Sequence, residues 1–263
     1  MIRMSRKATL DPDKSANLKV FGILTAGGVL GSLASLPYVF SLIEPPPIPI
    51  WQFLLLATIQ ASVQTAFLTG LGLWLGGKVG LGAPVLKAWL AGDPKAFHRF
   101  RSSLPISVGA GVVVAAIMLL LEIFVFVPLL PDALRKVSLP SLWQGFFASF
   151  YGGITEELML RLGLMTLLVW LGTKLTRQQH PKSSVMWSAI ALTALIFGAG
   201  HLPITARLVP LTPVVVTRAL LLNGIPGLLF GWLYWRKGLL AAMVAHFWSD
   251  IVLHVIGAAL FLA

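Results

Sequence analysis

The sequence predicts an all-α fold, a polytopic bundle of transmembrane helices. Of its 263 residues, 57% are hydrophobic and only 11% are charged, and the mean hydropathy is +0.87. These values are far from those of a soluble domain and typical of a chain that crosses a bilayer several times. The apolar residues also form separate runs, most of them long enough to span a hydrocarbon core, which takes about 20 residues.

Seven apolar runs are present, and each is predicted to form a membrane-spanning helix. They cover residues 19–43, 50–76, 104–130, 141–172, 184–201, 214–235 and 239–262. Tryptophans lie near the ends of several runs, as in the aromatic belts at membrane interfaces, and Trp51 and Trp74 flank the second. The fourth run is longer than one crossing needs, and Gly152-Gly153 is the expected place for a bend in it.

Lys and Arg are distributed unevenly among the connecting segments. Fifteen lie in segments 1–19, 77–103, 173–183 and 236–238, whereas three lie in segments 44–49, 131–140 and 202–213. Cytoplasmic loops collect Lys and Arg, and alternate loops lie on the same side of the membrane. We therefore expect an integral, multi-pass membrane protein with a cytoplasmic N-terminal segment, residues 1–18, and with the C-terminus outside after seven crossings.

The segment between the second and third runs has a mixed character. Residues 82–103 combine an apolar stretch around Trp89 with Lys95, Arg99 and Arg101. This pattern suits a helix lying on the cytoplasmic leaflet, and it suits a solvated loop equally well.

Composition also excludes several classes of function. The chain has no cysteine, which excludes a disulfide, a thiolate nucleophile, an iron–sulfur cluster and a cysteine-ligated zinc site. The net charge is +11, but the basic residues lie in short loops between apolar runs, so we do not expect a nucleic-acid partner. The expected surroundings are the lipid bilayer.

Three charged residues interrupt the fourth run, which otherwise has none: Glu156, Glu157 and Arg161. Ionisable groups inside a membrane cost several kcal/mol each unless they face a polar interior, so such a cluster indicates a functional site. Glu157 and Arg161 are four residues apart, which places them on one helix face as an ion pair. Glu156 is turned about 100° away and is free to act as a general base. The alternative is a structural ion pair that only fixes the orientation of the helix.

Two later runs carry further polar groups, His201 at the end of the fifth and His246 with Asp250 in the last. Counting 1.5 Å per residue from the cytoplasmic end places Glu156, His201 and Asp250 at about 20–27 Å, and His246 at about 14 Å. The last helix must therefore tilt, or start deeper, for all these groups to meet. Glu122, near the outer end of the third run, is a candidate partner for Arg218 or a residue that snorkels to the membrane surface.

The motifs EELMLR (156–161), FGAGH (197–201) and HFWSD (246–250) together resemble the CPBP family of intramembrane proteases. That family includes the type II CAAX prenyl endopeptidases and bacteriocin-processing relatives. The three motifs occur in the family's order, and the resemblance covers roughly residues 141–254. It implies a catalytic transmembrane region at 141–263, after an N-terminal transmembrane region at 19–140 that contains the interfacial loop 77–103. The family is usually drawn with eight transmembrane helices, so the expected number is seven to eight.

The resemblance also implies a role for each matching residue. Glu156 corresponds to the catalytic glutamate, and His201 to its helper in activating water. Glu157 and Arg161 correspond to the supporting pair. His246 corresponds to a residue that polarises the scissile carbonyl or binds a metal.

Asp250 stands where the family usually has an amide, and a carboxyl group must be protonated before it can donate to an oxyanion. Its role is therefore the least defined. The family is classed as metalloprotease, and Glu156, His201 and His246 could supply a two-His-one-carboxylate zinc site. A glutamate–histidine pair could equally activate water without metal. No HExxH motif is present, which argues against a conventional zincin site.

The function expected from these observations is an intramembrane endopeptidase that hydrolyses a peptide bond of a membrane-associated protein or peptide, in CAAX-type or bacteriocin-type processing. Two alternatives stay open. One is a non-proteolytic scaffold that binds partner membrane proteins. The other is a proton-coupled transporter, which usually shows related halves that this sequence lacks.

Overall fold

A computed structural model describes residues 12–130 and 139–259, and every regular element in them is helical. The all-α prediction is therefore confirmed for this part of the chain. In chain order, with η for π-helical or 3-10 segments, the elements are α1 (Pro12–Ala34), α2 (Leu36–Leu42), α3 (Ile50–Val79), α4 (Pro84–Leu90), α5 (Pro94–Leu121), η1 (Glu122–Phe126), η2 (Val127–Leu129), α7 (Leu142–Phe150), η3 (Tyr151–Glu156), η4 (Leu158–Met165), α8 (Thr166–Leu175), α9 (Ser183–Gly200), α10 (Leu202–Leu208), α11 (Pro213–Lys237), α12 (Leu239–Asp250) and η5 (Ile251–Gly257).

These elements join into seven spans long and apolar enough to cross a membrane within the described residues. They are Ser15–Leu42, Ile50–Val79, Pro94–Leu129, Leu142–Leu175, Ser183–Leu208, Pro213–Lys237 and Leu239–Gly257. Each corresponds to one predicted run. The protein is therefore a polytopic membrane protein.

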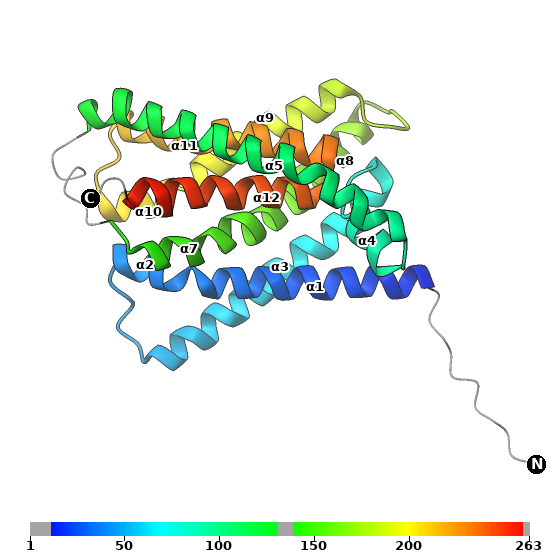
Figure 1. Cartoon of the computed structure of the whole chain (residues 1–263), viewed down its shortest axis with the longest axis horizontal. Coiled ribbons are helices and arrows are strands. Elements are labelled where there is room, and N and C mark those ends of the chain that lie inside the picture. The colour runs from blue at the N-terminus through cyan, green and yellow to red at the C-terminus, as the bar shows by residue number, and fades with distance from the viewer. Residues whose placement is uncertain (1–11, 131–138, 260–263) are drawn as a thin grey trace, which may run out of the picture.

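The connections gather at two ends of the bundle (Figure 1). The start of α1, α4 and the loop after α8 lie at one end, whereas α2 and α10 lie at the other. The first end holds most of the Lys and Arg counted above, and the predicted orientation places it in the cytoplasm. Most of the N-terminal segment expected over residues 1–18, and part of the loop 131–140, lie outside the described residues.

The predicted interfacial segment is divided between two helices. Leu86 of α4 is buried while Trp89 is more than half exposed, which is the amphipathic pattern expected there. The third span begins at Pro94, ten residues earlier than predicted, because Asp93 caps it and accepts a hydrogen bond from the Lys95 backbone N–H. The Arg99 side chain also donates a hydrogen bond to the Asp93 carboxylate. This bond, and after it the bond from the Lys95 N–H, lowers the pKa of the Asp93 carboxyl below its usual value.

The fourth span is one continuous helix, so its predicted run does not cross the membrane twice. It starts with Ser141, whose backbone N–H donates to the Gln144 side chain. It widens into π-helical turns beside Gly152-Gly153, where a bend was expected, and returns to α-helix at Thr166. π-Helical turns are rare and occur frequently at functional sites. This span therefore accommodates its extra length by widening.

Close helix contacts surround the widened segment. Thr155, beside Glu156, donates a hydrogen bond of 2.8 Å to the Gly28 carbonyl of α1. A Cβ atom at Gly31 would lie 2.7 Å from the Thr155 hydroxyl oxygen, and one at Gly72 of α3 would collide with the Leu162 carbonyl. Small residues thus allow α1 and α3 to approach η3 and η4 directly.

Glu122 and Arg218 join the third and sixth spans, just after α5 and near the start of α11, as the sequence suggested. Arg218 Nε and Nη2 donate to the two Glu122 carboxylate oxygens at 2.7 and 2.9 Å. The Glu122 side chain is 21% exposed and the Arg218 side chain 32% exposed, so this pair lies at the edge of the bundle rather than in its core.

Candidate functional site

Glu157 and Arg161 form the predicted ion pair inside the bundle. Arg161 Nη1 lies 3.0 Å from Glu157 Oε1, and both side chains are at most 1% exposed. Arg161 Nη2 also donates to the Gly227 carbonyl of α11 at 3.1 Å, which connects the pair to a second helix. The guanidinium plane lies 5.2 Å from the Phe197 ring centroid and 5.5 Å from that of Phe230, so two aromatic faces flank the cation.

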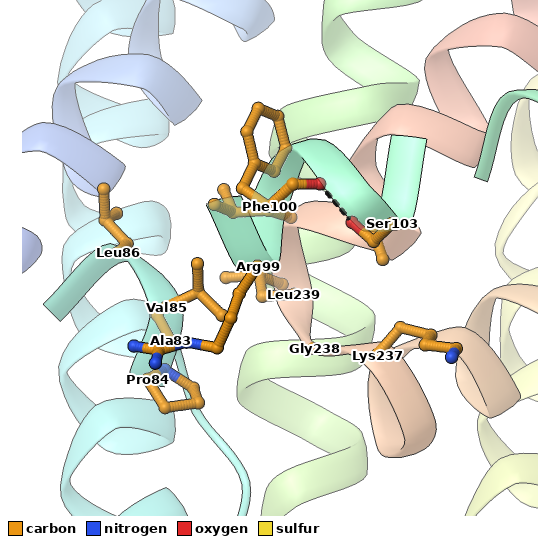
Figure 2. A pocket seen from close by; sticks show the side chains of 12 residues that line it. Ala83, Pro84, Val85, Leu86, Arg99, Phe100, Ser103, Lys237, Gly238 and Leu239 are labelled. Atoms are coloured by element: carbon orange, nitrogen blue, oxygen red, sulfur yellow. Dashed lines mark hydrogen bonds between the residues drawn. The ribbon is translucent and has the colours of Figure 1, made fainter. Parts of the chain in front are cut away.

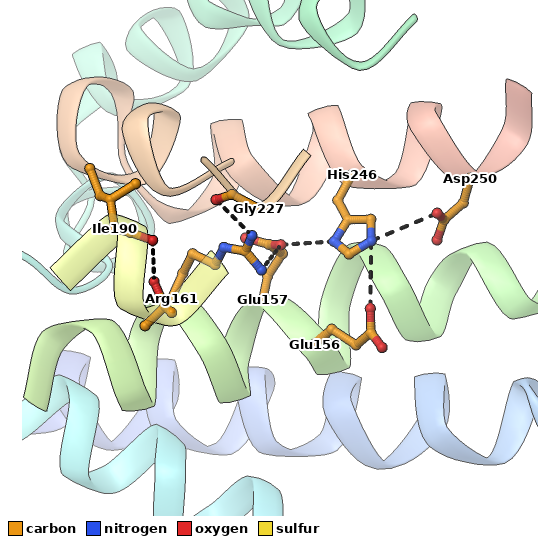
Figure 3. A network of polar contacts seen from close by, with 8 residues as sticks. Glu156, Glu157, Arg161, Ile190, Gly227, His246 and Asp250 are labelled. Carbon is orange, nitrogen blue, oxygen red and sulfur yellow. Dashed lines mark hydrogen bonds and ion pairs between the residues drawn. The ribbon is translucent and has the colours of Figure 1, made fainter. Parts of the chain in front are cut away.

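His246 lies at the centre of a cluster of three carboxylates (Figure 3). Its Nδ1 is 2.8 Å from Glu157 Oε1, and its Nε2 is 3.5 Å from Glu156 Oε2 and 3.7 Å from Asp250 Oδ1. The structure therefore brings together five of the six candidate residues, Arg161 included. They come from the fourth and the last spans.

The depth estimate from sequence placed His246 too far from Glu156. The fourth span has 34 residues and the last has 19, so their cytoplasmic ends need not lie at one depth. In addition, a π-helix holds more residues per turn and advances less per residue than the 1.5 Å assumed. Both effects bring Glu156 nearer to His246 than the count suggested.

The geometry fixes the tautomer of His246. Glu157 is paired with Arg161 and is therefore an ionised acceptor, so the Nδ1 that faces it must carry a proton. Nε2 then faces two more carboxyl groups, which repel its lone pair and each other. One additional proton, on Nε2 or on either carboxyl group, would relieve this repulsion.

Exposure divides the cluster into a closed and an open half. Glu157 and Arg161 are sealed, whereas the Glu156 and Asp250 side chains keep 14% and 13% of their exposure. The open half is where a water molecule or a substrate can reach a carboxylate.

Gly152 provides room for this cluster. A Cβ atom at this position would collide with the Asp250 carboxylate and lie 2.9 Å from His246 Nε2. Gly153, next in η3, would meet the Phe247 Cβ at 2.8 Å. Both glycines are thus needed for the close approach of η3 to α12, a role that the sequence analysis did not assign to them.

Aromatic rings hold the histidine in place. The Phe230 ring stacks on His246 at a centroid distance of 4.5 Å, and the Phe197 ring packs edge-on at 5.8 Å. Phe197 belongs to one of the three motifs. Phe230 was missed, because a phenylalanine inside an apolar run carries no signal of its own.

His201 is the candidate that the structure does not join to the carboxylates. Its Nδ1 lies 2.9 Å from the Phe197 carbonyl, and its ring packs on the Phe197 ring at 5.0 Å. Within the described chain it forms neither a hydrogen bond nor an ion pair with Glu156. His201 and His246 nevertheless share one neighbour, Phe197.

The metal site suggested for Glu156, His201 and His246 does not fit the side-chain positions found. In the described part of the chain, no three His, Asp or Glu side chains are arranged to hold a metal ion. The possible use of zinc stays a prediction, and no step is derived through it below.

A cavity at the basic end of the bundle lies apart from the cluster (Figure 2). Arg99 of α5 and Lys237 at the end of α11 line it, together with apolar residues of α4 and α12. Within it, Ser103 donates to the Phe100 carbonyl at 2.7 Å. None of the six candidate residues lines this cavity, so it contributes nothing to the site.

Comparison with known families adds to this geometry. Residues 138–252 match the family described as type II CAAX prenyl endopeptidase Rce1-like. The match covers less than half of the chain, and it contains all six candidate residues and all three motifs. The resemblance drawn from the motifs is therefore confirmed over this region. Comparisons with curated proteins and with solved structures gave no match.

Proposed function

We propose that the chain is an intramembrane endopeptidase that hydrolyses a peptide bond of a membrane-associated protein or peptide. The similarity of residues 138–252 to a CAAX protease family implies protease activity in a multi-pass membrane protein. The observation that carries the finer proposal is the cluster in which His246 contacts Glu156, Glu157 and Asp250 at the open edge of a sealed ion pair.

Glu156 is the general base in this proposal. It is partly exposed, has no cation in its own helix turn, and has His246 as its neighbour, whereas Glu157 is committed to Arg161. A water molecule bound at Glu156 gives up a proton to it as the water oxygen attacks the scissile carbonyl. The C–N bond then breaks, and Glu156 returns the proton to the leaving amine. The products are a carboxylic acid and an amine, and transfer of the acid's proton to the amine gives a carboxylate and an ammonium group.

The other candidate residues support this step. His201 keeps the water-activating role that the resemblance implies, although in this structure it bonds to the Phe197 carbonyl and not to Glu156. His246, when its Nε2 is protonated, donates to the developing oxyanion. Asp250 faces the same Nε2 and serves in its protonated form as a second donor or as the store of the additional proton. Glu157 and Arg161 fix the orientation of His246.

The test uses purified protein with a mixed set of membrane-anchored and CAAX-type peptides. Cleavage is compared among wild type, Glu156→Gln, His201→Ala and His246→Ala, with Glu122→Gln as a matched control outside the cluster. We expect Glu156→Gln and His246→Ala to lose at least about a hundredfold in kcat, as removal of one essential group does elsewhere. Cleavage that survives Glu156→Gln at the wild-type rate overturns the mechanism.

The same assay decides the metal question and the alternative function. Loss of cleavage on chelation with rescue by zinc assigns a metal, and unchanged cleavage assigns metal-free water activation. If wild type cleaves no peptide, a non-proteolytic scaffold becomes the favoured function. Full cellular function of the Glu156→Gln variant would then support the scaffold function.

A further inference from the structure

A second polar network runs from the basic end of the bundle toward the site. The Gly82 N–H, in the loop before α4, donates to the Tyr234 hydroxyl oxygen at 2.9 Å. That hydroxyl lies 2.7 Å from Thr166 Oγ1, which donates to the Arg161 carbonyl at 3.2 Å. Tyr234, Thr166 and Arg161 are each at most 1% exposed, so no bulk water competes for these bonds.

The direction of the hydrogen bonds in this network follows from counting protons. Thr166 has one hydroxyl proton and donates it to the Arg161 carbonyl, so Tyr234 must donate to Thr166. The Tyr234 oxygen is then left as the acceptor for Gly82. All four groups are thereby satisfied, and removal of the Tyr234 hydroxyl leaves the buried Gly82 N–H without an acceptor and Thr166 Oγ1 without its donor.

Thr166 has an unusual hydrogen-bond register. The other Ser and Thr hydroxyls that bond within the described helices donate to a carbonyl three or four residues earlier, as Thr173 does to Val169. Thr166 donates five residues back, and its backbone N–H reaches the same Arg161 carbonyl. This is the register of a π-helix. The Thr166 hydroxyl therefore adds a second bond that favours the wide turn of η4.

The register of η4 determines where Arg161 and Glu157 point. A π-helical turn holds one residue more than an α-helical turn. If this turn became α-helical, the residues before it would rotate by about 100° relative to the residues after it. Such a rotation would separate Glu157 from His246 or Arg161 from the Gly227 carbonyl.

We propose that Tyr234 is a positioning residue, whose hydroxyl holds η4 in the π-helical register through Thr166 and so aligns Arg161, Glu157 and His246. It also ties this alignment to the loop at Gly82, which leads into helix α4. The expected effect of Tyr234 on catalysis rests on the proposed function, whereas its effect on the positions of Arg161, Glu157 and His246 does not.

The experiment compares Tyr234→Phe, Thr166→Val and the double variant with Thr173→Val. Tyr234→Phe keeps the ring that packs in the core, and Thr166→Val keeps the side-chain shape. Thr173→Val is the matched control, because Thr173 is a buried threonine of the same helix that donates only to Val169. The two readouts are the ring ¹⁵N resonances of His246, assigned by their loss in His246→Gln, and peptide cleavage.

We expect the His246 resonances to move in Tyr234→Phe, Thr166→Val and the double variant, and to stay in place in Thr173→Val. We also expect kcat to fall about tenfold in each single variant, with KM changed less than about threefold, because misplaced groups reduce the chemical step. The double variant should lose no more than either single one, because both act through one network.

The result that overturns the proposal is an unchanged His246 spectrum in Tyr234→Phe or in Thr166→Val, or an equal shift in Thr173→Val. If Tyr234→Phe does not fold, Thr166→Val alone decides. If wild type cleaves no peptide, the proposed function fails, and the resonances still decide whether Tyr234 positions the site.

Discussion

His246 Nδ1 lies 2.8 Å from Glu157 Oε1, so the last span is hydrogen-bonded to the fourth at the residue that separates the π-helical segments η3 and η4. Glu157 therefore has two partners, Arg161 in its own helix and His246 in another. Fixing His246 in this way leaves its Nε2 facing Glu156 and Asp250, and the predictions below test the consequences.

Loss of the Arg161 cation should destabilise the protein as well as inactivate it. Arg161→Leu strands the Glu157 carboxylate in a sealed position, which costs on the order of 3–5 kcal/mol in the free energy of unfolding. The double variant Glu157→Leu/Arg161→Leu removes both charges and should recover part of this stability but little activity. Unfolding in detergent measures the first effect and peptide cleavage the second. Equal stability of the single and double variants would contradict the pairing.

A side chain at Gly152 should disrupt the site with a smaller effect on the fold. The Cβ atom of Gly152→Ala would displace the Asp250 carboxylate and crowd His246, and overpacking of this kind costs about 1–3 kcal/mol. We expect kcat to fall at least about tenfold, since 1 Å displacements reduce rates strongly. Gly109→Ala is the matched control, because a Cβ atom there meets nothing within 4 Å. Equal activity of both variants would show that the close approach at Gly152 is unimportant.

The ion pair of Glu122 and Arg218 should matter for stability and not for chemistry. Glu122→Gln leaves a partly buried guanidinium with a weaker partner, and we expect a loss of about 1–2 kcal/mol with kcat unchanged. The comparison is Asp93→Asn, which weakens the ion pair of Asp93 with Arg99 at the basic end of the bundle. The Arg99 side chain is 48% exposed and the Asp93 side chain 35%. Exposed pairs contribute little to stability, so this change should be close to neutral. A larger loss for Asp93→Asn than for Glu122→Gln would reverse the expected order.

The orientation predicted from Lys and Arg can be tested with reporter fusions. Fusions after Gly92 and after Gln178 should both read as cytoplasmic, whereas one after Pro46 should read as external, because these positions alternate between the two ends of the bundle. An external reading at Gln178 would mean that the order of crossings differs from the one described.

Several features could be predicted from the sequence because they depend on local spacing or on hydropathy. The seven spans follow from runs of about 20 or more apolar residues, and the Glu157–Arg161 pair follows from its i, i+4 spacing. The pairing of Glu122 with Arg218 was suggested by depth alone and is confirmed. The three motifs marked the region that matches a CAAX protease family.

Other features depended on how the helices meet. The count of 1.5 Å per residue separated His246 from Glu156, which the structure brings within 3.5 Å, and it gave no warning that His201 would bond to the Phe197 carbonyl instead of Glu156. The π-helical register of η4 and the hydrogen bond between Thr166 and Tyr234 were likewise not visible in the pattern of residues. Hydropathy fixes which segments lie in the membrane, but their relative depth and rotation depend on helix tilt, on the width of each turn and on contacts between distant residues. A one-dimensional period contains none of these quantities.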